Sequence, residues 1–313
     1  MKVKAKMFLA KLLIVFSVVF IGTGIWLTYI EEQTVLHPVK DVTVVAEAKS
    51  ETISVTTVSQ EEGDKSSQTV DSSQAGNVDL YAPSVESINT QLRNLIQNNY
   101  GVTVKYGSEV KGYSVGGMST AAVLDPNISK AALVNLNIAL SLYPEGFFQE
   151  MNSKGYPLTF YVLKNYSTKN VTGVTDSSSK NIVISVATDY DFVDTIHHEV
   201  YHYIEKYMIK EGAAFTSWDL LNPAKFKYGV IDANYAYART FSEEAFFVNS
   251  YAMTDQYEDR ASTFEYMMKQ NKASCLNHGK TVWLKAKTMS ETIDYFFSSV
   301  TPEVTEYWER HVY

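Results

Sequence analysis

The stretch from Asp194 to His202 reads Asp-Thr-Ile-His-His-Glu-Val-Tyr-His, and it constrains the fold more than any other part of the chain. Two of its histidines, His198 and His202, form the pattern H-E-x-x-H with Glu199 between them. On a helix, residues four apart lie on one face, about 5–6 Å apart at their Cβ atoms, so two imidazoles can reach one tetrahedral zinc ion. The sequence therefore predicts a helix that carries part of a metal site, and the fold must bring the remaining ligand to it.

Glu199 is the candidate general base of this motif. It lies about 100° around the helix from His198, so its carboxylate can approach a metal-bound water without itself binding the metal. His197 points about 100° to the other side, and we expect it to be structural. The alternative at this point is a solvated helix face on which two histidines occur by chance.

A catalytic zinc site needs three protein ligands and one open position. No histidine follows His202 until His278, so a carboxylate from a later helix is the better candidate. Two segments offer one, because Tyr237-Ala-Arg-Thr-Phe-Ser-Glu-Glu244 and Tyr251-Ala-Met-Thr-Asp-Gln-Tyr-Glu258 both read Tyr-x-x-Thr-x-x-x-Glu. The repeated frame leaves Glu244 and Glu258 both open as the third ligand.

This combination resembles the gluzincin metallopeptidases, which include the catalytic domain of anthrax lethal factor. The segment from Phe247 to Phe264 is also similar to the F-V-S-x-Y-A-x-T-N-x-x-E-D-x-A-E-x-F run of bacterial zinc-binding metallopeptidases. A second shared segment is Trp218-x-x-Leu-Asn-Pro-x-x-Phe-x-Tyr228. The likeness covers roughly Tyr143 to Met268. It departs from the family at Asp255, where the family has Asn, and at Ser262, where the family has Glu.

The resemblance implies a zinc metallopeptidase whose metal is bound by His198, His202 and Glu258, which favours Glu258 over Glu244. It implies that Glu199 activates the zinc-bound water and that the Tyr251 hydroxyl donates to the developing oxyanion; a buried core tyrosine is the alternative reading of Tyr251. Asp259 would accept a hydrogen bond from the second ring nitrogen of a ligand histidine, or would be an exposed acid of the first helical turn. Ser262 would weaken such a contact.

The N-terminal segment has the pattern of a membrane anchor. Lys2, Lys4, Lys6 and Lys11 precede an uncharged apolar run from Leu12 to Ile30, and Glu31 and Glu32 follow it. This run spans roughly 28 Å as a helix, close to the thickness of the hydrocarbon core of a bilayer. We expect residues 1–32 to be a cytoplasmic tip and a single-pass signal anchor, with the rest of the chain outside the cell. A cleaved signal peptide, which would make the protein secreted, is the alternative.

Aromatic residues divide the rest of the chain. The sequence has 22 Tyr and 15 Phe, yet no aromatic residue occurs between Glu31 and Leu80. We therefore expect a disordered extracellular linker at 33–79 and one zincin-like domain at 80–313. The net charge of −8 argues against nucleic acid as a partner. The single cysteine, Cys275, excludes an internal disulfide.

Local patterns predict an α+β fold, in which a small mixed sheet and the active-site helix precede a mainly helical C-terminal part. We expect a first helix from a Ser84 cap to just before Gly101, a strand at 102–106 and a second helix opened by Asn127 or Ser129. Strands are expected at 158–163 and 182–186, because β-branched and aromatic residues are concentrated there. We assign Ile182–Val186 as the edge strand beside the H-E-x-x-H helix, which Asp189 or Asp191 would cap.

The C-terminal part is expected to be helical at 243–253, 258–269 and 282–297, with a last short helix that begins at Thr301-Pro302-Glu303. The loop at 212–235 is expected to cover part of the site, and a plain surface loop is an equally good reading of its sequence.

The function expected from these features is zinc-dependent hydrolysis of peptide bonds in a peptide or protein substrate at the extracellular face. Cross-link peptides of a cell wall are possible substrates of the same chemistry. The opposing hypothesis is a membrane-tethered binding or structural module in which the metal is absent or only stabilises the fold. Glu199 argues against this module, because a structural metal site has no use for a base. The sequence does not indicate an oligomeric state.

Overall fold

The computed structural model describes residues 83–178, 181–189, 191–231, 245–269, 279–301 and 304–312. The predicted anchor at 1–32 and linker at 33–79 lie outside these ranges and stay predictions, and so does the domain boundary at residue 80. Glu244, Cys275 and His278 also lie outside them. Within the described ranges, no helix combines the length and the apolar character that crossing a bilayer requires.

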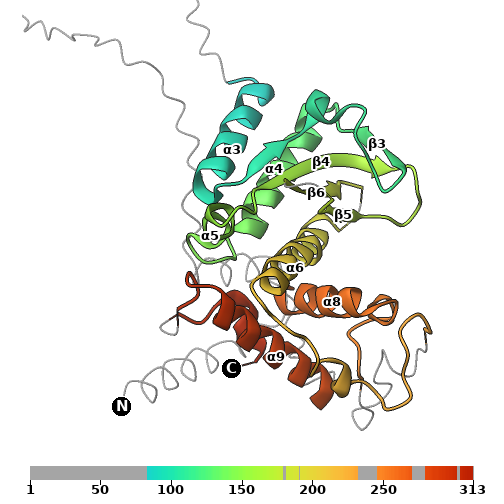
Figure 1. Ribbon diagram of the computed structural model, residues 1–313. Helices are drawn as coiled ribbons and strands as arrows, with labels where there is room; N and C mark the ends of the chain where they lie inside the picture. Colours follow the sequence, from blue (N-terminus) through green and yellow to red (C-terminus); the bar gives the residue numbers. More distant parts are fainter. Residues whose placement is uncertain are drawn as a thin grey trace, which may run out of the picture. The chain divides into compact units, whose positions relative to one another are not determined.

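A mixed sheet forms one layer of the fold (Figure 1). Its central strand, β4, pairs in parallel with β1 and β6 and antiparallel with β3. The order along the sheet is β2-β3-β4-β6-β5, with β1 also beside β4. The strands are β1 (Thr103–Lys105), β2 (Ser114–Val115), β3 (Met118–Ala122), β4 (Leu158–Tyr166), β5 (Gly173–Asp176) and β6 (Ile182–Ala187). The predicted mixed sheet is therefore present.

The assignment of Ile182–Val186 as the edge strand is wrong. β6 pairs with β4 on one side and with β5 on the other, where Val186 lies opposite Gly173. β5 is the strand at this end of the sheet, and its sequence Gly-Val-Thr-Asp hid it, because glycine and aspartate are depleted in strands. The apolar run of β6 fits its true place, since a strand between two others in a covered sheet has both faces buried.

Three helices precede the H-E-x-x-H segment: α3 (Val85–Tyr100), α4 (Pro126–Leu140) and α5 (Phe147–Ser153). The Ser84 cap of α3 is confirmed, because its side chain accepts a hydrogen bond from the backbone N–H of Ser87. The cap predicted for α4 is wrong. Asp125 caps that helix by accepting from Asn127 N at 2.8 Å, and Pro126 takes the first helical position, where its missing N–H costs nothing.

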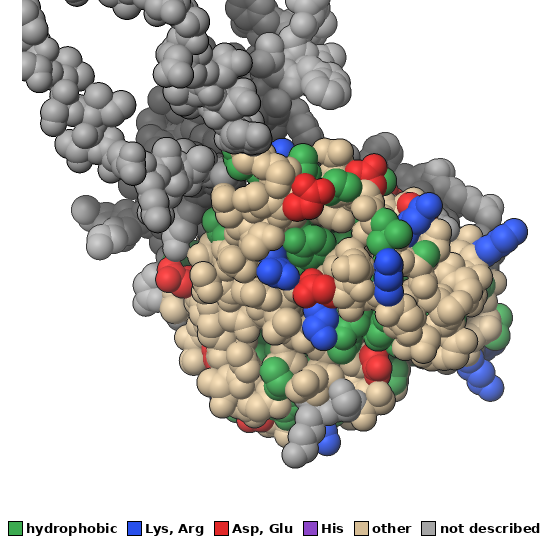
Figure 2. Space-filling model, turned by 90° about the horizontal axis from the view of Figure 1, so that it is seen from above, with side chains coloured by type: hydrophobic (Ala, Val, Ile, Leu, Met, Phe, Trp, Pro, Cys, Tyr) green, Lys and Arg blue, Asp and Glu red, His purple; other side chains and the backbone are tan. Residues whose placement is uncertain are grey.

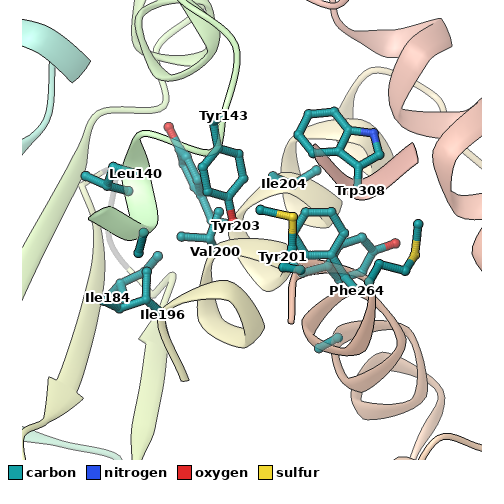
Figure 3. Packing of buried hydrophobic residues seen from close by; sticks show 14 of the residues in the cluster. Leu140, Tyr143, Ile184, Ile196, Val200, Tyr201, Tyr203, Ile204, Phe264 and Trp308 are labelled. Atoms are coloured by element: carbon teal, nitrogen blue, oxygen red, sulfur yellow. The ribbon is translucent and has the colours of Figure 1, made fainter. Parts of the chain in front are cut away.

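The H-E-x-x-H segment lies in α6 (Phe192–Lys210), which begins at Asp191 as one of the two predicted caps. α6 packs against the sheet on one side and against α8 (Gln256–Met268) on the other (Figure 1). Figure 3 shows Leu140, Ile184 and Ile196 on the sheet side of α6, and Phe264 and Trp308 on the opposite side. One apolar core thus surrounds α6 and holds it in place.

The C-terminal part departs from its predicted helices at two points. α8 and α9 (Lys280–Phe296) begin and end within two residues of the prediction. The expected helix at 243–253 is wrong for its described residues, because only Tyr251–Met253 (η4) forms a single 3-10 turn. Of the predicted start of the last helix, residues 302 and 303 lie outside the described ranges. The helix η6 (Tyr307–His311) begins later than predicted, with Glu306 as its N-cap, and the Glu309 carboxylate accepts a hydrogen bond from the backbone N–H of Glu306.

Charged side chains are interspersed on the face of the molecule shown in Figure 2, where acidic and basic groups lie singly among other residues. The described part of this face therefore has no continuous basic stripe of the kind that nucleic acid requires.

A cluster of carboxyl groups, Asp294, Glu306 and Glu309, lies where α9 meets η6. Burial first, and then the charge of Glu309, raise the pKa of Asp294 and of Glu306 to about 7. Glu291 adds to the repulsion at Asp294, and Arg310 partly offsets it at Glu306. The folded state therefore binds protons at Asp294 and Glu306 more tightly than the unfolded chain does. The stability that these protonated carboxyl groups contribute is present below about pH 4 and is lost as the pH rises through 7.

We predict that Asp294→Asn raises the urea midpoint of unfolding at about pH 8 and changes it little at about pH 4, because only the ionised carboxylate is repelled. The exposed Glu291→Gln variant is the control and should show a smaller difference between the two pH values. An equal shift of the Asp294→Asn midpoint at both pH values would contradict this account.

Candidate metal centre

Three side chains converge where the beginning of α8 meets the middle of α6. His198 Nε2 lies 2.9 Å from Glu258 Oε2, and His202 Nε2 lies 3.6 Å from the same oxygen. The two imidazole rings have centroids 5.0 Å apart, as expected for positions i and i+4. The possible ligand atoms of His198, His202 and Glu258 all lie within 4.8 Å of one another. Among the described residues, this is the group of side chains placed to hold a metal ion.

Glu258 is placed here by the start of α8. Asp255 caps the helix by accepting hydrogen bonds from the backbone N–H groups of Tyr257 at 2.7 Å and Glu258 at 2.9 Å. The metallopeptidases that the sequence resembles have Asn where this chain has Asp255, and the two residue types are equally good caps. The competing residue Glu244 lies outside the described part of the chain, so the structure places Glu258 but does not compare the two.

The electrostatics of the three side chains favour a positive charge between them. Burial opposes the charged form of His198, but hydrogen bonds to Glu258 and Glu265 outweigh it and raise the pKa of His198 to about 10. Burial likewise opposes ionisation of Glu258, yet hydrogen bonds to His198 and His202 hold its pKa well below the ordinary value. Two nitrogen donors and one carboxylate are a ligand set that zinc prefers, so the residues fit the metal that the motif implies.

Glu265 orients His198, a role that the sequence analysis assigned to Asp259. Its Oε2 lies 3.2 Å from His198 Nδ1, so a carboxylate contacts the ring nitrogen that faces away from Glu258. Lys269 Nζ lies 3.1 Å from the other oxygen of Glu265 and 2.9 Å from Asp194 Oδ2, which fixes the Glu265 carboxylate. The signal was available, because Glu265 follows Glu258 by seven residues and thus lies on the same face of α8. Ser262, where the similar metallopeptidases have Glu, takes no part in the contact between Glu265 and His198.

Asp259 serves a different purpose, about 100° around α8 from Glu258. Its fully buried Oδ2 accepts hydrogen bonds from Trp218 Nε1 at 2.7 Å, Tyr228 OH at 2.8 Å and Lys285 Nζ at 2.8 Å. Asp259, which directly follows Glu258, thereby connects α8 to the 212–231 loop and to α9. Trp218 and Tyr228, which belong to one sequence segment, thus share Asp259 as their acceptor.

The expectation that the loop covers the site is not supported within its described residues. Trp218 and Tyr228 turn toward Asp259, and none of residues 212–231 lines either cavity beside the metal centre.

Glu199 is held against β5. Thr175 Oγ1 donates to Glu199 Oε2 at 2.6 Å, and it lies 2.9 Å from the Glu199 carbonyl oxygen. Gly173 lets the strand approach this closely, since a Cβ atom there would lie 2.7 Å from Glu199 Cγ and 2.6 Å from Thr195 Cγ2. The carboxylate of Glu199 is thus buried beside the ligands but belongs to none of their contacts.

Tyr251 is not a core residue, so the alternative reading of its role is wrong. It is 53% exposed, and its ring centroid lies 5.9 Å from that of His198. Burial of part of the side chain, and then the neighbouring Glu258, raise the pKa of the Tyr251 hydroxyl well above its ordinary value. The hydroxyl therefore keeps its proton at neutral pH and can donate a hydrogen bond.

His197 has the structural position expected of it. It is fully buried, and its Nδ1 lies 3.0 Å from the hydroxyl of Tyr143. Burial lowers the pKa of His197 to about 3, so the ring is neutral at physiological pH.

Two cavities flank the candidate metal centre. One has a volume of about 690 Å³ and extends along β5 beside His202 and Glu258. The other, of about 370 Å³, lies beside His198 and Glu265. Gly173, Glu199 and Tyr251 line both of them. An extended ligand that follows β5 would therefore pass the three possible metal ligands and Glu199.

No family model matches the chain, and no curated protein sequence matches it. Among solved structures, the chain is similar to that of a "putative zinc-binding metallo-peptidase" from Bacteroides caccae ATCC 43185, with 14% identity and a TM-score of 0.47. The match covers 74% of this chain and 93% of the other. At so low a similarity, the function has to be argued from the side chains of the site.

We predict that Trp218→Phe lowers the free energy of unfolding by about 1–3 kcal/mol, because it removes a buried donor from the Asp259 carboxylate. Zinc affinity should fall as well, since Asp259 holds the part of α8 that carries Glu258. Urea unfolding and a zinc titration of the full-length chain measure the two effects. Trp283→Phe is the matched control, and the prediction fails if both substitutions have the same effects.

Proposed function

We propose that this chain is a zinc-dependent metallopeptidase in which His198, His202 and Glu258 bind the metal. The observation that supports this most is the convergence of their ligand atoms within 4.8 Å, with the carboxylate of Glu199 beside them but outside the ligand set. A site built only to hold a metal has no use for such a carboxylate. The second ring nitrogen of His198 already has its carboxylate partner in Glu265, as metal-ligating histidines usually do.

A zinc ion held by His198, His202 and Glu258 would supply Lewis acid chemistry, which makes a water acidic near neutral pH and polarises a peptide carbonyl. Glu199 then accepts the proton of the attacking water and transfers it to the amine that leaves. Thr175 holds one oxygen of Glu199, which leaves the other oxygen free to move the proton. Because β5 passes close to the Glu199 side chain at Gly173 and Thr175 binds its carboxylate, Glu199 has little freedom to turn away.

Tyr251 and β5 complete the proposed site. The Tyr251 hydroxyl, protonated at neutral pH, donates to the oxyanion that develops on the substrate carbonyl. Within the described residues, β5 pairs only with β6, so its outer edge can bind an extended peptide through backbone hydrogen bonds. Side chains of that peptide would occupy the two cavities.

The place of the reaction is also part of the proposal. The basic residues before Leu12–Ile30 and the acidic residues after it favour a single-pass anchor with the catalytic domain at the extracellular face. Peptides or proteins outside the cell would then be the substrates. Cleavage of the anchor would release the domain as a secreted enzyme.

We predict that the full-length chain hydrolyses unstructured peptides and that Glu199→Gln reduces kcat by at least about 100-fold, because general base catalysis contributes roughly 10²–10⁴. The zinc content of the variant should equal that of the wild-type chain. Peptide cleavage and elemental analysis measure these two quantities. Full activity of Glu199→Gln, or a folded and zinc-loaded wild-type chain that cleaves no member of a broad peptide library, would contradict the proposal and favour the surface-module hypothesis.

We also predict that Gly173→Ala reduces kcat by about 100-fold and leaves zinc content unchanged. The added Cβ would displace the Glu199 carboxylate, and a shift of about 1 Å is enough for a loss of that size. Val174→Ala, on the same strand, is the control and should retain most of the activity. If Gly173→Ala were as active as this control, β5 would not position Glu199.

A further inference from the structure

The larger cavity continues beyond the candidate metal centre along the second half of α6. His202, Lys206 and Lys210 follow one another at four-residue intervals and therefore lie on one face of the helix. All three line the cavity of about 690 Å³, and Thr175 and Ser177 line it from the side of β5. Two lysines thus stand in a row beyond the second possible metal ligand, between the helix and the sheet edge.

The acidic side chains of the same cavity already have partners. Glu205 forms a buried ion pair with Arg260, and Asp255 accepts the backbone hydrogen bonds that cap α8. Glu258 contacts the two histidines, and Glu199 accepts from Thr175. None of these carboxylates neutralises the lysines.

The positive charges of Lys206 and Lys210 are not balanced in the same way. Lys206 Nζ donates to the carbonyl oxygen of Ser177 at 2.5 Å, which is a neutral partner. In the described part of the chain, neither Lys206 nor Lys210 forms an ion pair with an Asp or Glu side chain. Burial first, and then repulsion by Lys210, lower the pKa of Lys206, while Asp176 opposes this only in part. An anion placed between the two ammonium groups would relieve this repulsion.

We propose that this end of the cavity is a subsite for a carboxylate of the substrate, which gives the enzyme a preference for peptides with Asp or Glu near the cleaved bond. The inference rests on the proposed peptidase function. It concerns one or two carboxylates only, so it is compatible with the net charge of −8, which disfavours polyanions as a whole.

The spacing along the helix sets the position of that carboxylate. Lys206 lies one turn and Lys210 two turns beyond His202, about 6 Å and about 12 Å along the helix axis. A peptide extended along β5 advances about 3.3 Å per residue. The acidic residue would therefore stand about two to four residues from the scissile bond, on the side of that bond that faces away from His198.

The test compares peptides that differ only by Glu or Gln at one position, from four residues before to four residues after the scissile bond. We expect the Glu peptide to be cleaved about five- to tenfold more efficiently, in kcat/KM, at one position about two to four residues away on one side. This ratio should fall to about one in the Lys206→Met/Lys210→Met double variant, where the rate with the Gln peptide is the internal reference for each protein. Lys225→Met, an exposed lysine outside the cavity, is the control.

Peptides with an amidated and with a free C-terminus distinguish a side-chain carboxylate from a terminal one. Cleavage with a Glu to Gln ratio near one at every position would overturn the subsite and leave the peptidase function intact.

A binding measurement separates the two proposals further. Fluorescence anisotropy with Glu199→Gln records peptide binding without turnover, so it applies even if no peptide is cleaved. Tighter binding of the Glu peptide, lost in the triple variant with Lys206→Met and Lys210→Met, would support the subsite. Equal binding of the Glu and Gln peptides would overturn it.

Discussion

The site depends on the packing of α8 against α6. His198 and Glu258 are 60 positions apart in the sequence, and they meet because these two helices share a buried interface. Two contacts fix that interface next to the ligands: the buried ion pair of Glu205 with Arg260, and the rings of Tyr201 and Phe264, whose centroids lie 5.2 Å apart. Removing one partner of such a buried pair leaves an uncompensated buried charge, so the pair favours the observed position of the two helices.

The acidic residues of α8 make two separate sets of contacts. Glu258 and Glu265 face α6, where one contacts both histidines and the other contacts His198. Asp259, about 100° around the helix from Glu258, instead accepts three buried hydrogen bonds, from Trp218, Tyr228 and Lys285. Asp259 therefore contacts none of the three candidate ligands through these hydrogen bonds, although it directly follows Glu258 in the sequence. This division explains how neighbouring acids in one short motif can have unrelated roles.

The candidate site could be predicted well from sequence where its residues belong to one helix. His198, Glu199 and His202 follow from the four-residue period of α6, and Glu258 followed from the resemblance. The role of Asp259 was predicted wrongly, because a motif names a residue but not the direction of its side chain. Glu265 was missed, although its spacing from Glu258 placed it on the right face. The partners Trp218 and Tyr228 could not be assigned to Asp259, since such contacts depend on how the loop returns.

Strands and caps show the same limit in the fold. β4 and β6 were found from their β-branched residues, but β5 was missed because Gly173 and Asp176 weaken the strand pattern. The close approach of β5 to Glu199 requires glycine at position 173. The same glycine weakens the strand pattern in the sequence, so β5 was not predicted. The late start of η6 has a similar cause, because Glu306 and Glu309 cap it reciprocally and a Thr-Pro signal upstream was misleading.

In the proposed site, Glu258 completes a zinc-binding group with His198 and His202. The most direct measurement is the zinc content and affinity of the full-length chain beside its Glu258→Ala and Glu265→Gln variants. We predict about one zinc per wild-type chain, loss of that zinc in Glu258→Ala, and an affinity about 10- to 100-fold weaker in Glu265→Gln. Wild-type affinity in Glu258→Ala would contradict the account and direct attention to Glu244.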